Sequence, residues 1–103
     1  MRLASRARLT RRAARDLASI WHWVRKDSGR SRAEGVLRSF AIATDRLIDL
    51  PELGTARPKY GEGLRCLVVR PYLIFYRKEA DGVTIVRIID GRRNLETLFD
   101  NET

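Results

Sequence analysis

The spacing of the apolar residues changes at Pro51, and this change divides the chain into a helical part and a strand-rich part. Before Pro51, apolar residues recur at intervals of three and four, which is typical of one face of a helix. Residues 51–63 are rich in proline and glycine and read as a connector. After this connector, β-branched and aromatic residues form short runs that are typical of strands. The sequence therefore predicts an α+β domain.

The helical part predicts two helices joined by a polar turn over 25–30. Thr10 is a suitable N-cap for a first helix over 11–25. Ser31 and Glu34 match a capping box that would open a second helix, and Pro51 stops it. Gly35 within that helix indicates close packing against the first helix. The apolar positions are Ala13, Leu17, Ile20, Trp21 and Val24, then Ala33, Val36, Leu37, Phe40, Ala43, Leu47 and Leu50. A short loop between two such helices predicts an antiparallel helical hairpin.

The N-terminal segment allows two interpretations. Its first fifteen residues contain six arginines and no acidic residue, as a mitochondrial transit peptide does. However, Leu3, Ala7 and Leu9 fall at even spacing with Arg6 and Arg8 between them, as a half-buried edge strand requires. We favour the strand.

Three β-rich runs follow the connector, over Leu64–Arg70, Tyr72–Lys78 and Val83–Asp90. Pro71 separates the first two runs, and Asp81-Gly82 is a hairpin signal between the second and third. These runs predict an antiparallel meander, so the element order is β-α-α-β-β-β, with a small and mainly antiparallel sheet. Residues 92–99 would form a short helix or an extended tail.

Strict alternation in the last strand predicts two apolar faces. It puts Val83, Ile85, Arg87 and Ile89 on one face and Thr84, Val86, Ile88 and Asp90 on the other. One helical hairpin can cover only one face of the sheet. The other face would then be covered by the C-terminal tail, by a partner, or by both.

Length and composition narrow the possible functions. The 103 residues suffice for a single domain over 1–103, and the formal net charge of +8 comes mainly from arginine, which favours a polyanionic or acidic partner. No apolar run is long enough to cross a bilayer. One cysteine and one histidine argue against a disulfide framework, a metal centre or a Ser–His–Asp triad, so no metal or cofactor is expected.

Several motifs in a fixed order resemble the ParE/RelE superfamily, the toxins of type II toxin–antitoxin modules. They are Ala14-Arg15-Asp16-Leu17 with Ile20-Trp21, Leu47 to Gly54, Gly63-Leu64-Arg65, the strand Tyr72 to Arg77, and Val83 to Arg93. Each motif alone is weak, but the ordered set covers nearly the whole chain. The superfamily's fold agrees with the element order predicted from periodicity.

The resemblance implies one of two activities. RelE-like members are ribosome-dependent messenger-RNA endonucleases, and under that alternative Arg65, Arg77 and Arg93 would be catalytic. Phe99 falls where that branch carries a tyrosine, and Leu73 falls where it carries an arginine. A phenyl ring cannot transfer a proton. The chain resembles ParE-like members more closely, which implies a protein without catalytic residues that poisons DNA gyrase by stabilising its cleaved complex with DNA.

The resemblance also implies partners: a ParD-like antitoxin that forms a hetero-oligomer with the toxin, and DNA gyrase, or the ribosome under the alternative, all in the cytoplasm. Candidate residues for binding antitoxin or target are Arg11, Arg12, Arg15, Trp23, Arg65, Arg77, Arg87, Arg92, Arg93 and Phe99. The strand arginines among them could instead be solvated residues with buried stems. Cys66 is expected to be a buried thiol, and Tyr76 to pack within its strand. A third hypothesis, a basic nucleic-acid-binding domain without toxicity, is disfavoured because the aromatic residues look like core residues.

Overall fold

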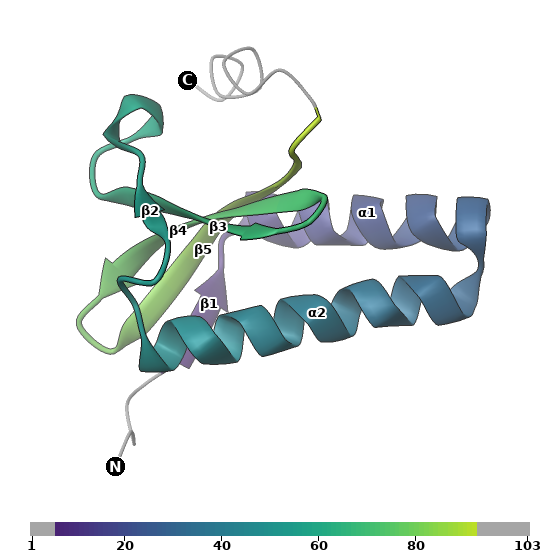
Figure 1. Cartoon of the computed structure of the whole chain (residues 1–103), viewed down its shortest axis with the longest axis horizontal. Coiled ribbons are helices and arrows are strands. Elements are labelled where there is room, and N and C mark those ends of the chain that lie inside the picture. Colours follow the sequence, from purple (N-terminus) through teal and green to yellow (C-terminus); the bar gives the residue numbers. More distant parts are fainter. Residues whose placement is uncertain (1–5, 93–103) are drawn as a thin grey trace.

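The computed structural model describes residues 6–92 and confirms the predicted α+β class (Figure 1). Its elements are β1 (Arg6–Leu9), α1 (Arg11–Ser28), α2 (Arg30–Asp49), β2 (Thr55–Ala56), the 3-10 turn η1 (Pro58–Tyr60), β3 (Leu64–Val69), β4 (Tyr72–Glu79) and β5 (Gly82–Asp90). The connector differs from the prediction because it contains β2 and η1. Leu3 and the predicted tail beyond residue 92 lie outside the described residues.

One five-stranded sheet carries the helical hairpin on one of its faces. The strand order is β1-β5-β4-β3-β2, and β1 runs parallel to β5 while every other pair is antiparallel. Figure 1 shows that the two helices run side by side and that their connected ends project beyond the sheet. This projecting end leaves part of the inner face of the hairpin without a strand against it.

The helix boundaries confirm one predicted cap and contradict the other. Thr10 Oγ1 accepts a hydrogen bond from Ala13 N at 3.0 Å, so Thr10 caps α1 as expected. The capping box of Ser31 and Glu34 is wrong, because α2 already begins at Arg30 and Gly29 occupies its N-cap without a side-chain bond. Gly29 alone joins the helices at a φ of 94°, a left-handed conformation that favours glycine. With a one-residue joint, α1 continues three residues past its predicted end.

A β-bulge changes the predicted faces of β5. Tyr76 pairs with Ile85, but the preceding residue, Phe75, pairs with Arg87, so Val86 is an extra residue in β5. The alternation therefore shifts after Ile85. Ile88, and not Ile89, joins the core under the hairpin. The predicted faces were therefore wrong for Ile88 and Ile89, whereas Val86 packs on the face opposite the hairpin, as predicted.

The sheet has a buried apolar cluster on each face, as expected from the apolar residues that alternate along its strands. The cluster under the hairpin comprises Ala13, Phe40, Ala43, Leu47, Tyr72, Ile74, Tyr76, Val83, Ile85 and Ile88. The cluster on the opposite face comprises Leu64, Cys66, Phe75 and Ile89, and the Tyr60 ring packs edge-on against Phe75 at 5.8 Å. The expectation of a buried Cys66 thiol is confirmed.

The predicted close packing of Gly35 against the first helix is wrong. A Cβ atom at this position would meet only the Arg38 guanidinium, 3.6 Å away. Gly35 instead lines an open cleft beneath the projecting end of the hairpin.

Candidate functional site

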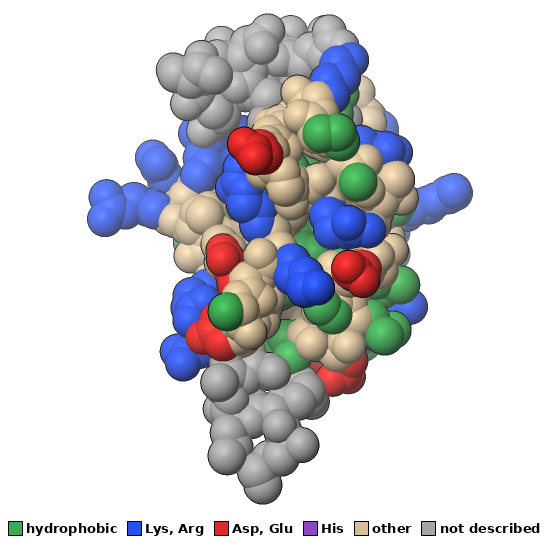
Figure 2. All heavy atoms as spheres, turned by 90° about the vertical axis from the view of Figure 1, so that its left-hand side faces the viewer, with side chains coloured by type: hydrophobic (Ala, Val, Ile, Leu, Met, Phe, Trp, Pro, Cys, Tyr) green, Lys and Arg blue, Asp and Glu red, His purple; other side chains and the backbone are tan. Residues whose placement is uncertain are grey.

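Arg65 and Arg77, two of the candidate catalytic residues, anchor loops. Arg65 Nε donates to Gly54 O at 2.9 Å, and its Nη2 donates to Glu52 O at 3.1 Å. Arg77 Nε donates to Glu62 O at 3.1 Å. These bonds hold the segments on either side of β2 and η1 against the sheet. On this side of the molecule, basic side chains are interspersed with acidic and apolar ones (Figure 2).

Tyr76 pairs with Arg65 across the sheet and precedes Arg77 in the chain. Its hydroxyl is hydrogen-bonded to the loop that follows α2. Its side chain is fully buried, and its hydroxyl donates to Pro51 O and accepts from Gly54 N, both at 2.8 Å. A hydroxyl in this position satisfies two main-chain groups that would otherwise be buried without a partner. The arrangement is structural in character, because both hydrogen bonds of the hydroxyl are made to the main chain.

Arg87 was expected among the binding residues, but the structure buries it. It is 4% exposed, and its Nε lies 2.8 Å from Asp16 Oδ2. Asp16 Oδ2 also accepts from Ile88 N at 3.0 Å. A buried guanidinium requires a charged partner, and here the Asp16–Arg87 pair connects α1 to the edge of β5 and leaves Arg87 almost no exposed surface.

The arginines of the first turns of α1 are exposed, as expected for contact residues. Arg12 Nε lies 3.5 Å from Asp16 Oδ1, one helical turn away. Arg11 and Arg15 take part in no ion pair within the part of the chain that the structure describes. The helix dipole disfavours positive charge at this end, and an anionic partner would relieve that cost.

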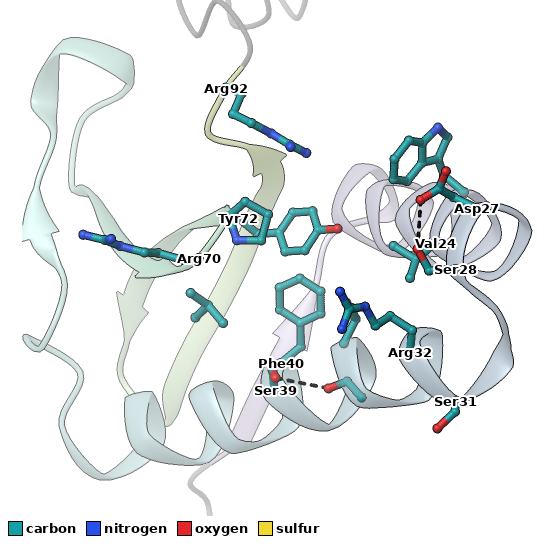
Figure 3. A pocket seen from close by; sticks show the side chains of 15 residues that line it. Val24, Asp27, Ser28, Ser31, Arg32, Ser39, Phe40, Arg70, Tyr72 and Arg92 are labelled. Atoms are coloured by element: carbon teal, nitrogen blue, oxygen red, sulfur yellow. Dashed lines mark hydrogen bonds between the residues drawn. The ribbon is translucent and has the colours of Figure 1, made fainter.

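A cleft of about 770 Å³ lies between the projecting end of the hairpin and the turn that joins β3 to β4. Its apolar wall includes Val24, Phe40 and Tyr72, and the rings of Phe40 and Tyr72 lie 5.6 Å apart. Burial is the main cause of the raised pKa of Tyr72, followed by the nearby Asp90 carboxylate. Figure 3 shows the Arg32 and Arg92 side chains reaching over this wall from opposite sides.

Trp23 and Arg92, two of the candidate binding residues, lie at the rim of this cleft. Trp23 is 61% exposed, as a candidate contact residue has to be. Arg92 Nε donates to Asp90 Oδ1 at 2.9 Å, and this hydrogen bond is the main cause of the raised pKa of Arg92. The structure thus brings Trp23 and Arg92 to one cleft, whereas Arg65 and Arg77 hold loops. Arg93 and Phe99 lie outside the described residues.

Sequence reasoning missed three arginines that border hollows on the molecule: Arg32, Arg46 and Arg70. The sequence could have indicated two of them as candidates, because Arg32 and Arg46 lie on the predicted second helix, which has the longest run of regularly spaced apolar residues. Arg70 could not be placed without the fold. Over residues 6–92, no cluster of metal-ligating side chains is present, and no helix is long and apolar enough to cross a membrane.

These features define a small basic α+β domain whose exposed arginines and cleft are suited to binding another macromolecule. The chain belongs to the family of ParE toxins of the type II toxin–antitoxin system parDE, whose family model matches residues 7–95. It is 33% identical to Toxin ParE3 of Caulobacter vibrioides over 94 residues, which covers 91% of this chain and 94% of that protein.

The fold has a close counterpart among solved structures. A chain of the chromosomal ParDE TA system from P. aeruginosa superposes with a TM-score of 0.71 at 24% sequence identity. The match covers 84% of this chain and 96% of that one. At this identity the likeness shows that the two chains share a fold.

Proposed function

We propose that this ParE-type toxin acts in the cytoplasm by binding DNA gyrase and stabilising the cleaved gyrase–DNA complex. On this proposal a ParD-like antitoxin neutralises the toxin by forming a hetero-oligomer with it, and the toxin breaks no covalent bond itself. Family membership supports the toxin and antitoxin roles, because the matched family is that of the parDE system.

One observation supports a mechanism by binding rather than by catalysis. The side chains that a nuclease would use are hydrogen-bonded to the main chain of loops. A ribonuclease needs a base to activate the 2′-hydroxyl, a proton donor and cations near the phosphate. Tyr76 is fully buried with both of its hydroxyl bonds made to the main chain. Arg65 and Arg77 donate to loop carbonyls. This use of the three side chains favours gyrase binding over the RelE-like endonuclease alternative.

We expect the antitoxin to dock on the helical hairpin and to continue toward the meander. A toxin with a net charge of +8 fits an acidic amphipathic segment that folds on binding. The exposed candidates for these contacts, or for contacts with the target, are Arg11, Arg12, Arg15, Trp23 and Arg92. Arg93 and Phe99 remain candidates from the sequence.

Induced expression in cells tests the proposal. We expect growth arrest and loss of plasmid supercoiling when the toxin is expressed alone, and normal growth when the reading frame adjoining its gene is co-expressed. Cleavage of messenger RNA before any change in plasmid topology would instead favour the endonuclease. Growth arrest that co-expression does not relieve would contradict the antitoxin role of the adjoining frame.

A further inference from the structure

The outward face of α1 carries a straight row of polar side chains, which we call the α1 stripe. It consists of Arg11, Arg15, Ser19, His22 and Lys26. These residues are three or four apart in sequence, so they lie one above the other along the helix. All five are exposed, whereas the opposite side of the helix buries Ala13 and Val24. The stripe therefore points away from the core under the hairpin.

The positive charges of the α1 stripe are not neutralised by carboxylates of the same chain. Arg11, Arg15 and Lys26 form no ion pair within the described part of the chain. By contrast, the guanidinium groups of Arg8 and Arg87 lie 2.7 and 2.8 Å from an Asp carboxylate. The stripe is thus a line of unneutralised cations, which attracts a polyanion.

The two acidic residues of α1 lie off the stripe. The Asp16 side chain is only 10% exposed and is paired with Arg87. Asp27 lines the cleft, where its carboxylate accepts from Ser28 Oγ at 2.8 Å (Figure 3). The outward face of α2 differs, because it includes three exposed acidic residues, Glu34, Asp45 and Asp49. Of the two helices in the hairpin, α1 is therefore the one whose outward face carries charge of a single sign.

The helix dipole adds positive potential at the end of the stripe where arginines are densest. Arg11, Arg12 and Arg15 lie within the first five residues of α1, and its first turn contains no acidic residue. Positive charge at a helix N-terminus lowers helix stability, and a bound anion offsets this cost. Arginines at positions where folding disfavours them indicate a contact with an anion.

The shape of the stripe fits duplex DNA. From Arg11 to Lys26 it extends about 22 Å at a rise of 1.5 Å per residue. B-DNA carries about one negative charge per 1.7 Å of axis, and its major groove admits an α-helix. Ala14 and Ala18 are exposed beside the stripe, and their short side chains let a DNA backbone approach the helix. The major groove of A-form RNA is deep and narrow, so the same helix fits RNA less well.

We propose that the α1 stripe binds the phosphate backbone of duplex DNA, in the segment that gyrase holds in the cleaved complex. Arg11, Arg15 and Lys26 would each contact a phosphate, and Ser19 and His22 would donate hydrogen bonds between them. Such contacts require no aromatic residues for stacking on bases. This inference rests on the proposed function, because gyrase supplies the cleaved DNA, and it makes the toxin hold the DNA as well as the enzyme.

Salt-dependent binding to a short DNA duplex tests the stripe without gyrase. A fluorescent duplex of about 20 base pairs is titrated with folded toxin between about 50 and 200 mM salt, and the slope of log affinity against log salt counts the phosphate contacts. For three contacts we expect a slope of about −2.7, which is a loss of affinity of about 40-fold over this range. An RNA duplex of the same length should bind at least about threefold more weakly.

Matched variants locate the contact on α1. Arg11→Gln and Arg15→Gln should each reduce the steepness of the slope by about 1, whereas Arg38→Gln, the same loss of charge on the outward face of α2, should leave it unchanged. In the gyrase cleavage assay, the double variant Arg11→Gln/Arg15→Gln should require about tenfold more toxin for the same amount of linear DNA, and Arg38→Gln should require no more. Circular dichroism checks folding, which Gln should preserve because its helix propensity is close to that of Arg.

The other outcomes are also decisive. A folded toxin that binds no duplex at 50 mM salt, yet produces cleaved DNA with gyrase, would overturn the role of the stripe and leave the proposed function intact. Equal affinity for the RNA duplex, or an unchanged slope in the two stripe variants, would overturn it as well.

An antitoxin that covers the stripe gives a different result. If the stripe variants lost affinity for the antitoxin and kept their affinity for DNA, the stripe would be an antitoxin surface and the proposal would be overturned. Duplex binding by a toxin that produces no cleaved DNA with gyrase would contradict the proposed function and, with it, the placing of the bound DNA in gyrase.

Discussion

The Asp16 carboxylate on α1 accepts a hydrogen bond from the main chain of β5 where no neighbouring strand pairs with it, and the Arg87 guanidinium neutralises the charge of that carboxylate. β1 ends at Leu9, opposite Ile85, so the edge of β5 beyond that pair has no parallel strand. The Asp16 carboxylate accepts from Ile88 N and from Arg87 Nε, while Thr10 Oγ1 donates to Val86 O. The Asp16 and Arg87 side chains are only 10% and 5% exposed.

Replacing Asp16 by Asn should destabilise the fold strongly. The substitution leaves the Arg87 guanidinium buried without a counter-charge, and removal of one partner of a buried ion pair costs about 3–5 kcal/mol. Urea unfolding followed by circular dichroism measures the loss. Arg12→Ala removes only an exposed contact to the same carboxylate, so it should cost less than about 1 kcal/mol. Equal losses in the two variants would contradict the role given to Arg87.

Tyr76→Phe tests whether the hydroxyl is structural. Removing it leaves Pro51 O and Gly54 N without their bonds inside the protein, which should lower the free energy of unfolding by about 1–3 kcal/mol. The variant should keep its toxicity at temperatures where it remains folded. Loss of toxicity with unchanged stability would point instead to a chemical role for Tyr76, as the endonuclease alternative requires.

Two glycines should respond in opposite directions to alanine. A Cβ on Gly54 would lie 2.7 Å from the Tyr76 ring and 2.8 Å from Cys66 O, so Gly54→Ala should destabilise the protein by about 1–3 kcal/mol. Gly35 lies in a helix beside the open cleft, and Gly35→Ala should stabilise it by up to about 1 kcal/mol. Thermal unfolding of both variants gives the comparison, and a destabilised Gly35→Ala would contradict the open cleft.

The Cys66 thiol should be protected in the native protein. Burial raises its pKa, which lowers the share of reactive thiolate, and the side chain has little access to reagent. Labelling by a disulfide reagent at pH 8 should therefore proceed at the rate of unfolding and accelerate in urea. Because the unfolded chain releases this proton at a lower pH, the contribution of Cys66 to stability is complete below the unfolded pKa and is lost as pH rises from there through the raised pKa of the folded protein. Rapid labelling without denaturant would contradict this burial.

Local patterns were enough to predict the element order, apart from β2 and η1 in the connector. Thr10, the apolar helical spacing and the hairpin signal at Asp81-Gly82 act over a few residues, and each lies where the pattern indicates. The capping box failed because Gly29 can turn the chain by itself. No local signal marks Val86 as an extra residue, so the shift from Ile89 to Ile88 in the core required the strand pairing.

The candidate site was harder to predict than the fold. The exposure of Trp23 followed from its place on the helix, but the burial of Arg87 depends on Asp16, 71 residues away in sequence. The cleft beneath the projecting end of the hairpin likewise arises where the two helices meet the turn between β3 and β4, so no single segment shows it alone. Arginines that the sequence alone does not distinguish thus have different roles: Arg65 and Arg77 hold loops, Arg87 is buried in an ion pair, and Arg11 and Arg15 are exposed.

Purified gyrase provides the most direct test of the central claim, that this toxin acts by binding. Toxin is added to gyrase and supercoiled plasmid, and the linear DNA released by detergent and protease is quantified. We expect linear DNA to accumulate with toxin concentration and to disappear when the antitoxin is added first. A folded toxin that produces no cleaved DNA over a broad concentration range, yet cleaves messenger RNA on purified ribosomes, would contradict the account.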